Sequence, residues 1–195
     1  MQAWIKKILA IVRSGVSRMF AAREDNSKAD VVAVLREVNL LSALTRRQLF
    51  HIASSLHRRH YKRDEIIYYE GDPGLGLYIV EDGTVDLVSS SPPSDSSPSI
   101  LGSNQVFGVA SMFGDVRREE TARATQQTSL LGLFSPELKS LVRRNPAVGS
   151  ALLMVLAEYL AETAVNNSRD YRSLAASISA QGSSDTPAAI VTESQ

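Results

Sequence analysis

The sequence has no cysteine among its 195 residues. Disulfide bonds, thiolate nucleophiles, cysteine-based zinc sites and iron–sulfur clusters are therefore excluded. It also has no net charge, because 21 Lys and Arg balance 21 Asp and Glu. A nucleic-acid-binding domain relies on a positive surface, so this balance argues against that class of protein. No nucleophile elbow, P-loop or paired-carboxylate motif occurs either, and we predict that the protein is not an enzyme.

Long hydrophobic runs are missing as well. The longest uncharged apolar run near the N-terminus, Ile8–Val12, is far shorter than the roughly 20 residues that span a bilayer. Arg13 also interrupts the apolar core that a signal peptide needs. At about 100° per residue, the apolar and basic side chains fall on opposite halves of a helix. We therefore predict a basic amphipathic helix that contacts a partner protein or an anionic membrane surface. The contacting residues are Trp4, Ile5, Lys6, Lys7, Ile8, Leu9, Val12, Arg13, Val16, Arg18, Met19 and Phe20.

Two short helices are expected next. Apolar residues recur at helical spacing over residues 31–38, and Thr45 with Gln48 forms a capping box that begins a second helix. The basic segment 57–63 is interpreted as a solvated turn that leaves this helix. Its two histidines are three residues apart but have no third strong ligand, so we predict no metal site.

From Tyr61 to Phe134 the pattern changes to short β-rich runs separated by turn residues such as Gly71-Asp72-Pro73-Gly74. Strands this close together favour an antiparallel sandwich or barrel. The Ser- and Pro-rich segment 89–99 is expected to be an exposed loop. The predicted strands cover residues 66–69, 75–80, 84–88, 100–101, 120–125 and 129–134.

Two helices are predicted at the C-terminal end, each with a polar cap followed by proline, at Ser135-Pro136 and Asn145-Pro146. The second is long, and a row of its residues is separated by steps of three and four, the spacing of a seam that packs along another helix. This seam either covers the β-domain and then frays, or pairs two copies of the chain as a homodimer. Beyond Gln181 the tail is small and polar, and we expect disorder there. The seam residues are Leu153, Leu156, Leu160, Ala164, Asn167, Tyr171, Leu174 and Ile178.

Several of these motifs together resemble the cyclic-nucleotide-binding domain. The resemblance rests on Glu70-Gly71-Asp72-Pro73-Gly74, on Leu77-Tyr78-Ile79-Val80 and on Asp82-Gly83-Thr84-Val85. Residues 101–108 are similar to the approach to the phosphate-binding cassette of that family, and Thr121-Ala122 to its exit. The resemblance covers residues 34–165. It implies a mainly β fold with flanking helices: an antiparallel β-roll of the jelly-roll type with N-terminal helices and a long C-terminal helix.

The resemblance also implies a ligand pocket, with two departures. A cyclic phosphodiester needs backbone N–H groups and a guanidinium, and its ribose hydroxyl needs a carboxylate acceptor. The family has Glu after the cassette glycine and Arg before the Thr or Ser at the exit, whereas this sequence has Val109 and Glu120. Arg123 could reach the anion in place of the missing arginine, or it is solvated. Arg117 and Arg118 lie in the cassette turn and could also approach the anion, but a solvated loop is the favoured interpretation. The pocket residues by position are Gly108, Val109, Ala110, Thr121, Arg123 and Thr163.

These observations predict a non-catalytic regulatory or sensor module with weakened or lost cyclic-nucleotide binding, acting through a protein or membrane partner. The alternative is a working sensor of cyclic AMP, cyclic GMP or another small anion, with no further cofactor. DNA or RNA binding is a third, weaker hypothesis, and no helix-turn-helix for specific DNA binding is expected after Val165. We expect a cytoplasmic protein, in peripheral contact with a membrane if the first helix docks there. The expected parts are residues 1–27 (helix and hinge), 28–167 (domain) and 168–195 (helix extension and tail).

Overall fold

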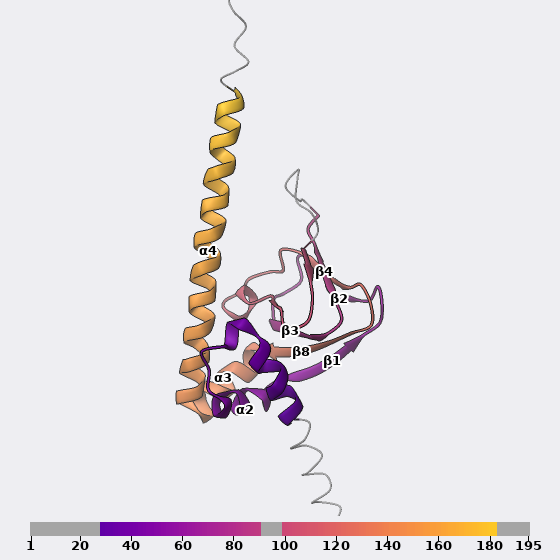
Figure 1. The fold of residues 1–195 in the computed structure, drawn as a ribbon, viewed down its shortest axis with the longest axis vertical. Helices are drawn as coiled ribbons and strands as arrows, with labels where there is room; N and C mark the ends of the chain where they lie inside the picture. Colours follow the sequence, from indigo (N-terminus) through magenta and orange to yellow (C-terminus); the bar gives the residue numbers. More distant parts are fainter. Residues whose placement is uncertain (1–27, 91–98, 183–195) are drawn as a thin grey trace, which may run out of the picture. The chain divides into compact units, whose positions relative to one another are not determined.

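The computed structural model describes residues 28–90 and 99–182. The predicted amphipathic helix at 1–27, most of the Ser- and Pro-rich loop and the tail after Gly182 lie outside the described residues. The chain divides after Leu156, within the last helix, into two compact units, each of which is described by itself. The first unit contains the β-structure (Figure 1).

Within the described residues, eight strands form two antiparallel four-stranded sheets, which confirms the predicted β-roll (Figure 1). The first sheet has the order β1-β8-β3-β6 and the second β2-β7-β4-β5. In chain order the strands are β1 (His57–Tyr61), β2 (Ile66–Tyr68), β3 (Gly76–Asp82), β4 (Val85–Val88), β5 (Ser99–Leu101), β6 (Val106–Phe107), β7 (Thr121–Ala124) and β8 (Thr128–Phe134).

Strand β3, inside the first sheet, is buried on both of its faces. Its first five residues, from Gly76 to Val80, are all buried. Tyr78 and Val80 belong to the core between the two sheets, together with Val85, Phe107 and other residues of both sheets. The alternate residues point to the opposite face of a strand, where Leu77 and Ile79 meet apolar side chains from the helices. The sequence of β3 is therefore continuously hydrophobic instead of alternating.

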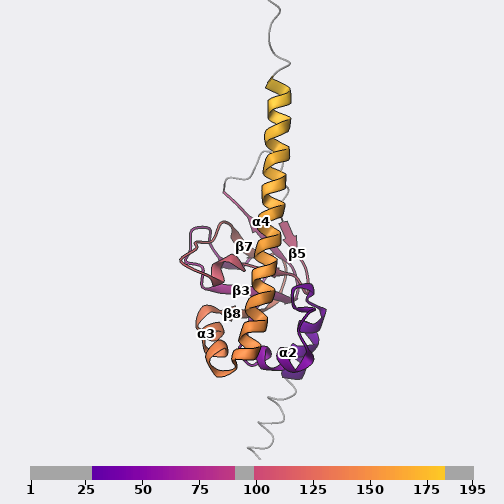
Figure 2. The ribbon, with the colours of Figure 1, turned by 90° about the vertical axis from the view of Figure 1, so that its left-hand side faces the viewer.

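The helices of the first unit cover that outer face of the first sheet. They are residues 28–37, the 3₁₀ turn η1 (Asn39–Leu41), α2 (Arg46–Ala53), α3 (Ser135–Arg144) and the beginning of α4 (Pro146–Gly182). Figure 2 shows α2 and α3 on either side of the first turns of α4. The predicted capping box of α2 is confirmed, because Thr45 and Gln48 bond each other's backbone N–H groups reciprocally.

Two local predictions were wrong. Residues 57–61 form the edge strand β1, paired with β8 from His57↔Gly132 to Tyr61↔Thr128, instead of a turn. Its first four side chains are exposed, so no hydrophobic alternation revealed the strand. At the start of α3, Ser135 is the first helical residue and not its side-chain cap. Its hydroxyl instead donates to the carbonyl of Met112 at 3.1 Å.

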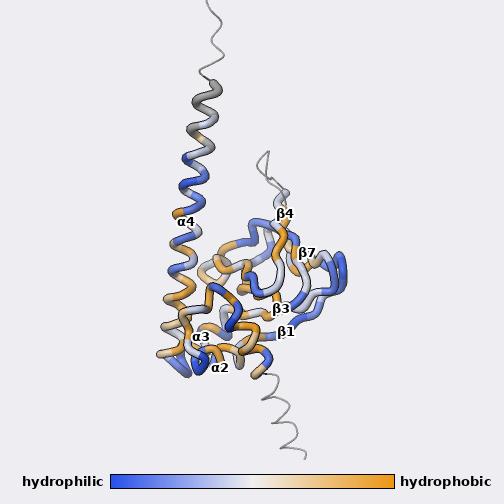
Figure 3. The backbone as a smooth tube through the Cα atoms, in the orientation of Figure 1, coloured by the Kyte–Doolittle hydropathy of each residue, from blue (hydrophilic) through white to orange (hydrophobic). Residues whose placement is uncertain are grey.

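Helix α4 is also the one helix of the described chain that is long and apolar enough to cross a membrane, over Pro146–Ser173. Its mean hydropathy there is 1.5. A core helix of a soluble protein passes the same test, and Val148, Leu152 and Leu156 of this helix are buried. Figure 3 shows that the hydrophobic residues concentrate in its first half. The finding is therefore weak evidence for a membrane role.

Candidate functional site

The segment from Gly108 to Thr121, called the cassette below, connects β6 to β7 through the 3₁₀ turn η2 (Ala110–Met112). Gly108 has φ +72°, a left-handed conformation that favours glycine. A Cβ at this position would collide with Nη1 of Arg118. Glycine is therefore required at position 108 for two reasons: the left-handed backbone of the turn after β6, and the close approach of the Arg118 guanidinium group.

Arg118 is the central side chain of the cassette. Only 6% of it is exposed. Its Nη2 donates to the carbonyl of Gly76 at 2.7 Å, and its Nη1 donates to Oγ of Ser111 at 3.1 Å and to the carbonyl of Gly108 at 3.4 Å. The guanidinium carbon lies 4.1 Å from the ring centre of Tyr68. Arg118 therefore ties the start of β3 to η2 and to the aromatic core.

The charge of this guanidinium is only partly compensated. Within residues 28–90 and 99–182, no carboxylate forms an ion pair with Arg118, and its Nε has no hydrogen-bond partner. A buried charge without a counter-ion is costly, and carbonyl dipoles and an aromatic face offset only part of that cost. An anion that reached Nε would therefore be bound favourably, by a charge-assisted hydrogen bond. The cassette is a candidate anion-binding site.

A short pairing with the turn after β2 decides which arginine points inward. Pro73 and Arg117 form an antiparallel bridge, and the N–H of Arg118 donates to the carbonyl of Asp72 at 2.9 Å. Neighbouring side chains on an extended segment point in opposite directions. Arg117 is therefore exposed, with its Nη1 on the carbonyl of Gly71 at 2.6 Å, while Arg118 is buried.

Two predictions about the cassette were consequently wrong. Arg118 does not lie in a solvated loop, although Arg117 does lie at the surface. Nor has the cassette lost its positive group to Glu120, because Arg118 supplies it two residues earlier. The sequence did contain two adjacent arginines, Arg117 and Arg118, at this position of the cassette. It could not show which of the two side chains points inward.

Acidic residues lie at the exit of the cassette. Burial, followed by the charges of Glu119 and Glu70, raises the pKa of half-buried Glu120 above its ordinary value of 4.5. The carboxylate of Glu70 accepts hydrogen bonds from the N–H and hydroxyl of Ser90, which lower its pKa. The N–H of Glu70 donates to Oγ1 of Thr121 at 3.0 Å. Acidic side chains therefore lie at the exit of the cassette, and the repulsion of an approaching anion by them stays a prediction.

The structure brings some of the predicted pocket residues together and separates others. Gly108 and Val109 lie at the cassette with Arg118, and Val109 is buried. Ala110 is exposed at the start of η2. Arg123 points away from the core of the roll and forms an ion pair with Asp86 on the neighbouring strand at 3.1 Å, so it is engaged elsewhere. Thr163 belongs to the second unit, where its hydroxyl donates to the carbonyl of Tyr159.

An aromatic cluster lies beneath Arg118 inside the roll. The ring centres of Tyr68, Tyr78 and Phe107 lie 5.4–6.2 Å apart, and Phe134 meets Tyr78 edge-on at 5.9 Å. Burial raises the pKa of Tyr68 to about 12, although Arg118 opposes the shift. Its hydroxyl therefore stays protonated at neutral pH, and the ring acts as a neutral platform for the cation. No property of the sequence pattern singled out Tyr68 for this role.

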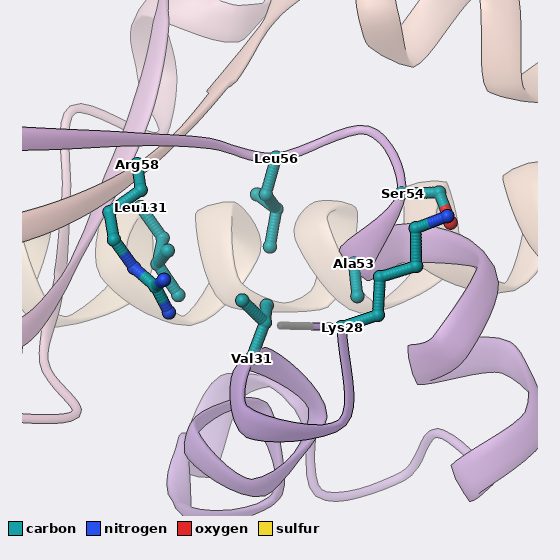
Figure 4. A pocket seen from close by; sticks show the side chains of 7 residues that line it. All are labelled: Lys28, Val31, Ala53, Ser54, Leu56, Arg58 and Leu131. Carbon is teal, nitrogen blue, oxygen red and sulfur yellow. The ribbon is translucent and has the colours of Figure 1, made fainter. Parts of the chain in front are cut away.

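Among residues 28–90 and 99–182, the other candidate side chains already have contacts of their own. In the described part of the chain, no three His, Asp or Glu residues come together as a metal site. His57 and His60 contact Glu137 and Ser129 respectively. A pocket of about 270 Å³ lies between residues 28–31, α2 and β1 (Figure 4). Arg58 at its edge already holds Glu81 in two hydrogen bonds of 2.6 and 2.7 Å.

Comparison with known proteins agrees with the fold. Residues 58–145 match the family model described as cyclic nucleotide-binding domain. The chain belongs to this family. The N-terminal domain of a transcriptional regulator from Streptomyces coelicolor A3(2) has 31% sequence identity and a TM-score of 0.59, and the match covers 67% of this chain and 94% of that one.

Two curated relatives are regulatory proteins of the same family. The cyclic AMP receptor protein of Thermus thermophilus is 34% identical over 56% of this chain and 51% of its own length. The cAMP-dependent protein kinase type II regulatory subunit of Drosophila melanogaster is 29% identical over 47% of this chain and 24% of its own length. The chain thus spans about half or less of these relatives, and its fold is that of a cyclic nucleotide-binding domain with regulatory homologues.

Proposed function

We propose that the chain is a non-catalytic regulatory module that binds a small anion at Arg118, with cyclic AMP and cyclic GMP as the first candidates. The observation that carries this proposal is the buried guanidinium whose Nε has no partner within the described residues. The family membership supplies the ligand class. A phosphodiester has one negative charge and paired oxygens, which match the geometry of a guanidinium.

Binding is weakened at the sugar. Val109 stands where the resemblance implies a carboxylate for the ribose hydroxyl, and its side chain offers no hydrogen-bond acceptor. Only 3% of Val109 is exposed, so a polar ligand group placed against it would lose hydrogen bonds to water without replacement. We therefore expect 2′-deoxy cyclic AMP to bind as tightly as cyclic AMP. A preference of tenfold or more for the ribose form would contradict this part of the proposal.

The direct experiment is calorimetric titration of the chain with cyclic AMP and cyclic GMP. Arg118→Gln should weaken binding by about 30-fold or more, since truncating one partner of a buried charge pair costs about 2–5 kcal/mol and each decade of affinity corresponds to about 1.4 kcal/mol. Arg117→Gln is the matched control, because it changes the same group one residue away at the surface. It should leave the affinity within about twofold.

The acidic residues at the exit of the cassette support a second candidate function. In that case Arg118 serves only to hold the roll together, and the domain is a ligand-free interaction unit. Thermal unfolding distinguishes the two functions. A ligand at 100 times its dissociation constant adds about 2.7 kcal/mol, or roughly 5–11 °C for a chain of this size. The absence of any shift at millimolar cyclic nucleotide would leave only the ligand-free function.

For the partner, the proposal relies on residues 1–27. Their basic amphipathic pattern favours a protein partner or an anionic membrane surface, which would place a cytoplasmic protein at the membrane periphery. Binding to anionic liposomes should fall with added salt and be lost in Ile8→Asp. If the wild type does not bind such liposomes, the membrane alternative is wrong and the proposed partner is a protein.

A further inference from the structure

Charged residues of the second unit form a stripe along α4. Glu158, Glu162, Val165, Arg169 and Arg172 are separated by four, three, four and three residues. Residues at this spacing lie on one face of a helix. All five are exposed, Val165 by 49%. The stripe is acidic before Val165 and basic after it.

A single helix cannot pair these charges. Glu158 and Glu162 are neighbours at i, i+4, and Arg169 and Arg172 at i, i+3, so each pair repels. The acidic and basic residues nearest to each other, Glu162 and Arg169, are seven residues or about 10 Å apart along the axis. No ion pair within residues 28–90 and 99–182 involves any of the four.

We infer that a second copy of this chain docks on the stripe in antiparallel orientation, with the twofold axis near Val165. Glu158 and Arg172 each lie seven residues from Val165, and Glu162 and Arg169 lie three and four residues from it. A twofold rotation about this point therefore places each acidic residue of one helix opposite a basic residue of the other. The two members of each pair are at the same height along the helix axis to within one residue, or about 1.5 Å. The pairs are Glu158 with the partner's Arg172 and Glu162 with the partner's Arg169, each occurring twice.

A parallel dimer on the same face would place like charges together. It would oppose Glu158 to the partner's Glu158 and Arg172 to the partner's Arg172, which costs free energy at every level of the stripe. The charge order therefore selects the orientation as well as the partner.

The centre of the stripe suits close contact between two helices. A shallow groove runs along it, lined by Ala161, Glu162, Val165, Asn166 and Arg169. Ala161 and Val165 are small and exposed, so two helices can approach closely at the axis. The seam predicted from the sequence occupies a different face, and its second residue, Leu156, is fully buried in the first unit.

Sedimentation equilibrium of the full chain tests the inference with charge-reversal variants. The wild type should dimerise, and either E158R/E162R or R169E/R172E should weaken the dimer by about tenfold to a hundredfold, since four exposed ion pairs contribute up to about fivefold each. Mixing the two variants, or combining all four changes in one chain, should restore the dimer. A monomeric wild type, or double variants that dimerise like the wild type, would overturn the inference.

Disulfide cross-linking tests the orientation of the two helices. Because the chain has no native cysteine, only the introduced cysteines can form disulfides. Glu158 and Arg172 are exposed, lie on the face of the stripe and are at its opposite ends. In an equimolar mixture of Glu158→Cys and Arg172→Cys chains, an antiparallel dimer should give the mixed disulfide and keep the other three ion pairs. Disulfides formed between identical chains would show a parallel dimer and refute the antiparallel arrangement.

Discussion

Alanine at Gly108 tests whether Arg118 occupies the cassette in solution. Gly108 has φ +72° and Gly114, in the same segment, has φ +75°. An alanine forced into this conformation costs about 1–2 kcal/mol at either position. The surroundings differ, because a Cβ at Gly114 meets nothing within 4 Å whereas one at Gly108 collides with the guanidinium of Arg118. Gly114→Ala is therefore a matched control for backbone strain.

The expected magnitudes follow from the bonds of Arg118. Gly114→Ala should lower the melting temperature by about 2–8 °C. This range follows because the backbone strain costs about 1–2 kcal/mol, and each kcal/mol lowers the melting temperature of a chain of this size by about 2–4 °C. Gly108→Ala must in addition displace the guanidinium from the Gly76 carbonyl and the Ser111 hydroxyl, which costs a further 1–3 kcal/mol or so. It should also weaken anion binding, which Gly114→Ala should preserve.

Chemical denaturation and calorimetric titration of both variants provide the measurements. A double-mutant cycle sharpens them, because the extra cost of Gly108→Ala should disappear when Arg118→Ala has already removed the guanidinium. Equal unfolding free energies and equal anion affinities for Gly108→Ala and Gly114→Ala would refute the placement of Arg118. The proposal for the cassette would then lose its main support.

Two further predictions concern charges near the cassette and on the second sheet. Burial and the neighbouring Glu119 and Glu70 raise the pKa of Glu120, so the folded protein binds a proton at this carboxyl group more tightly than the unfolded chain does. The protonated carboxyl group therefore contributes to stability at low pH, and this contribution is lost as pH rises above about 4.5. Glu120→Gln should therefore unfold at higher denaturant concentration than the wild type at pH 7, and the difference should vanish below pH 4; a constant difference at all pH values would contradict this cause. Arg123→Ala removes the ion-pair partner of Asp86, which is only 7% exposed and has an unpartnered Oδ1. A loss of about 1–2 kcal/mol in unfolding free energy is expected, less than for a fully buried pair because Arg123 is partly exposed, and an unchanged value would show that water already satisfies Asp86.

Local sequence determined most of the elements. The capping box at Thr45 and Gln48 and the turn at residues 71–74 specify their structures through neighbouring side chains and backbone conformations, so they can be read without tertiary contacts. The same holds for β2, β3, β4, β5, β7 and β8, whose β-rich runs are bounded by turn residues, whereas the two-residue strand β6 was not predicted. Their order and their glycines together identified the β-roll.

Pairing between distant segments decided the rest. β1 is a strand because its backbone bonds to β8, about 70 residues away, and its exposed basic side chains leave no hydrophobic pattern. Likewise, Arg117 and Arg118 are identical residues in the sequence, and the backbone bonds to Asp72 and Pro73 determine which one is buried. Hydrophobic periodicity predicts which side chains are buried, but it does not predict which backbone groups form hydrogen bonds between distant segments. The position of the cation in the cassette therefore became visible only in the tertiary structure.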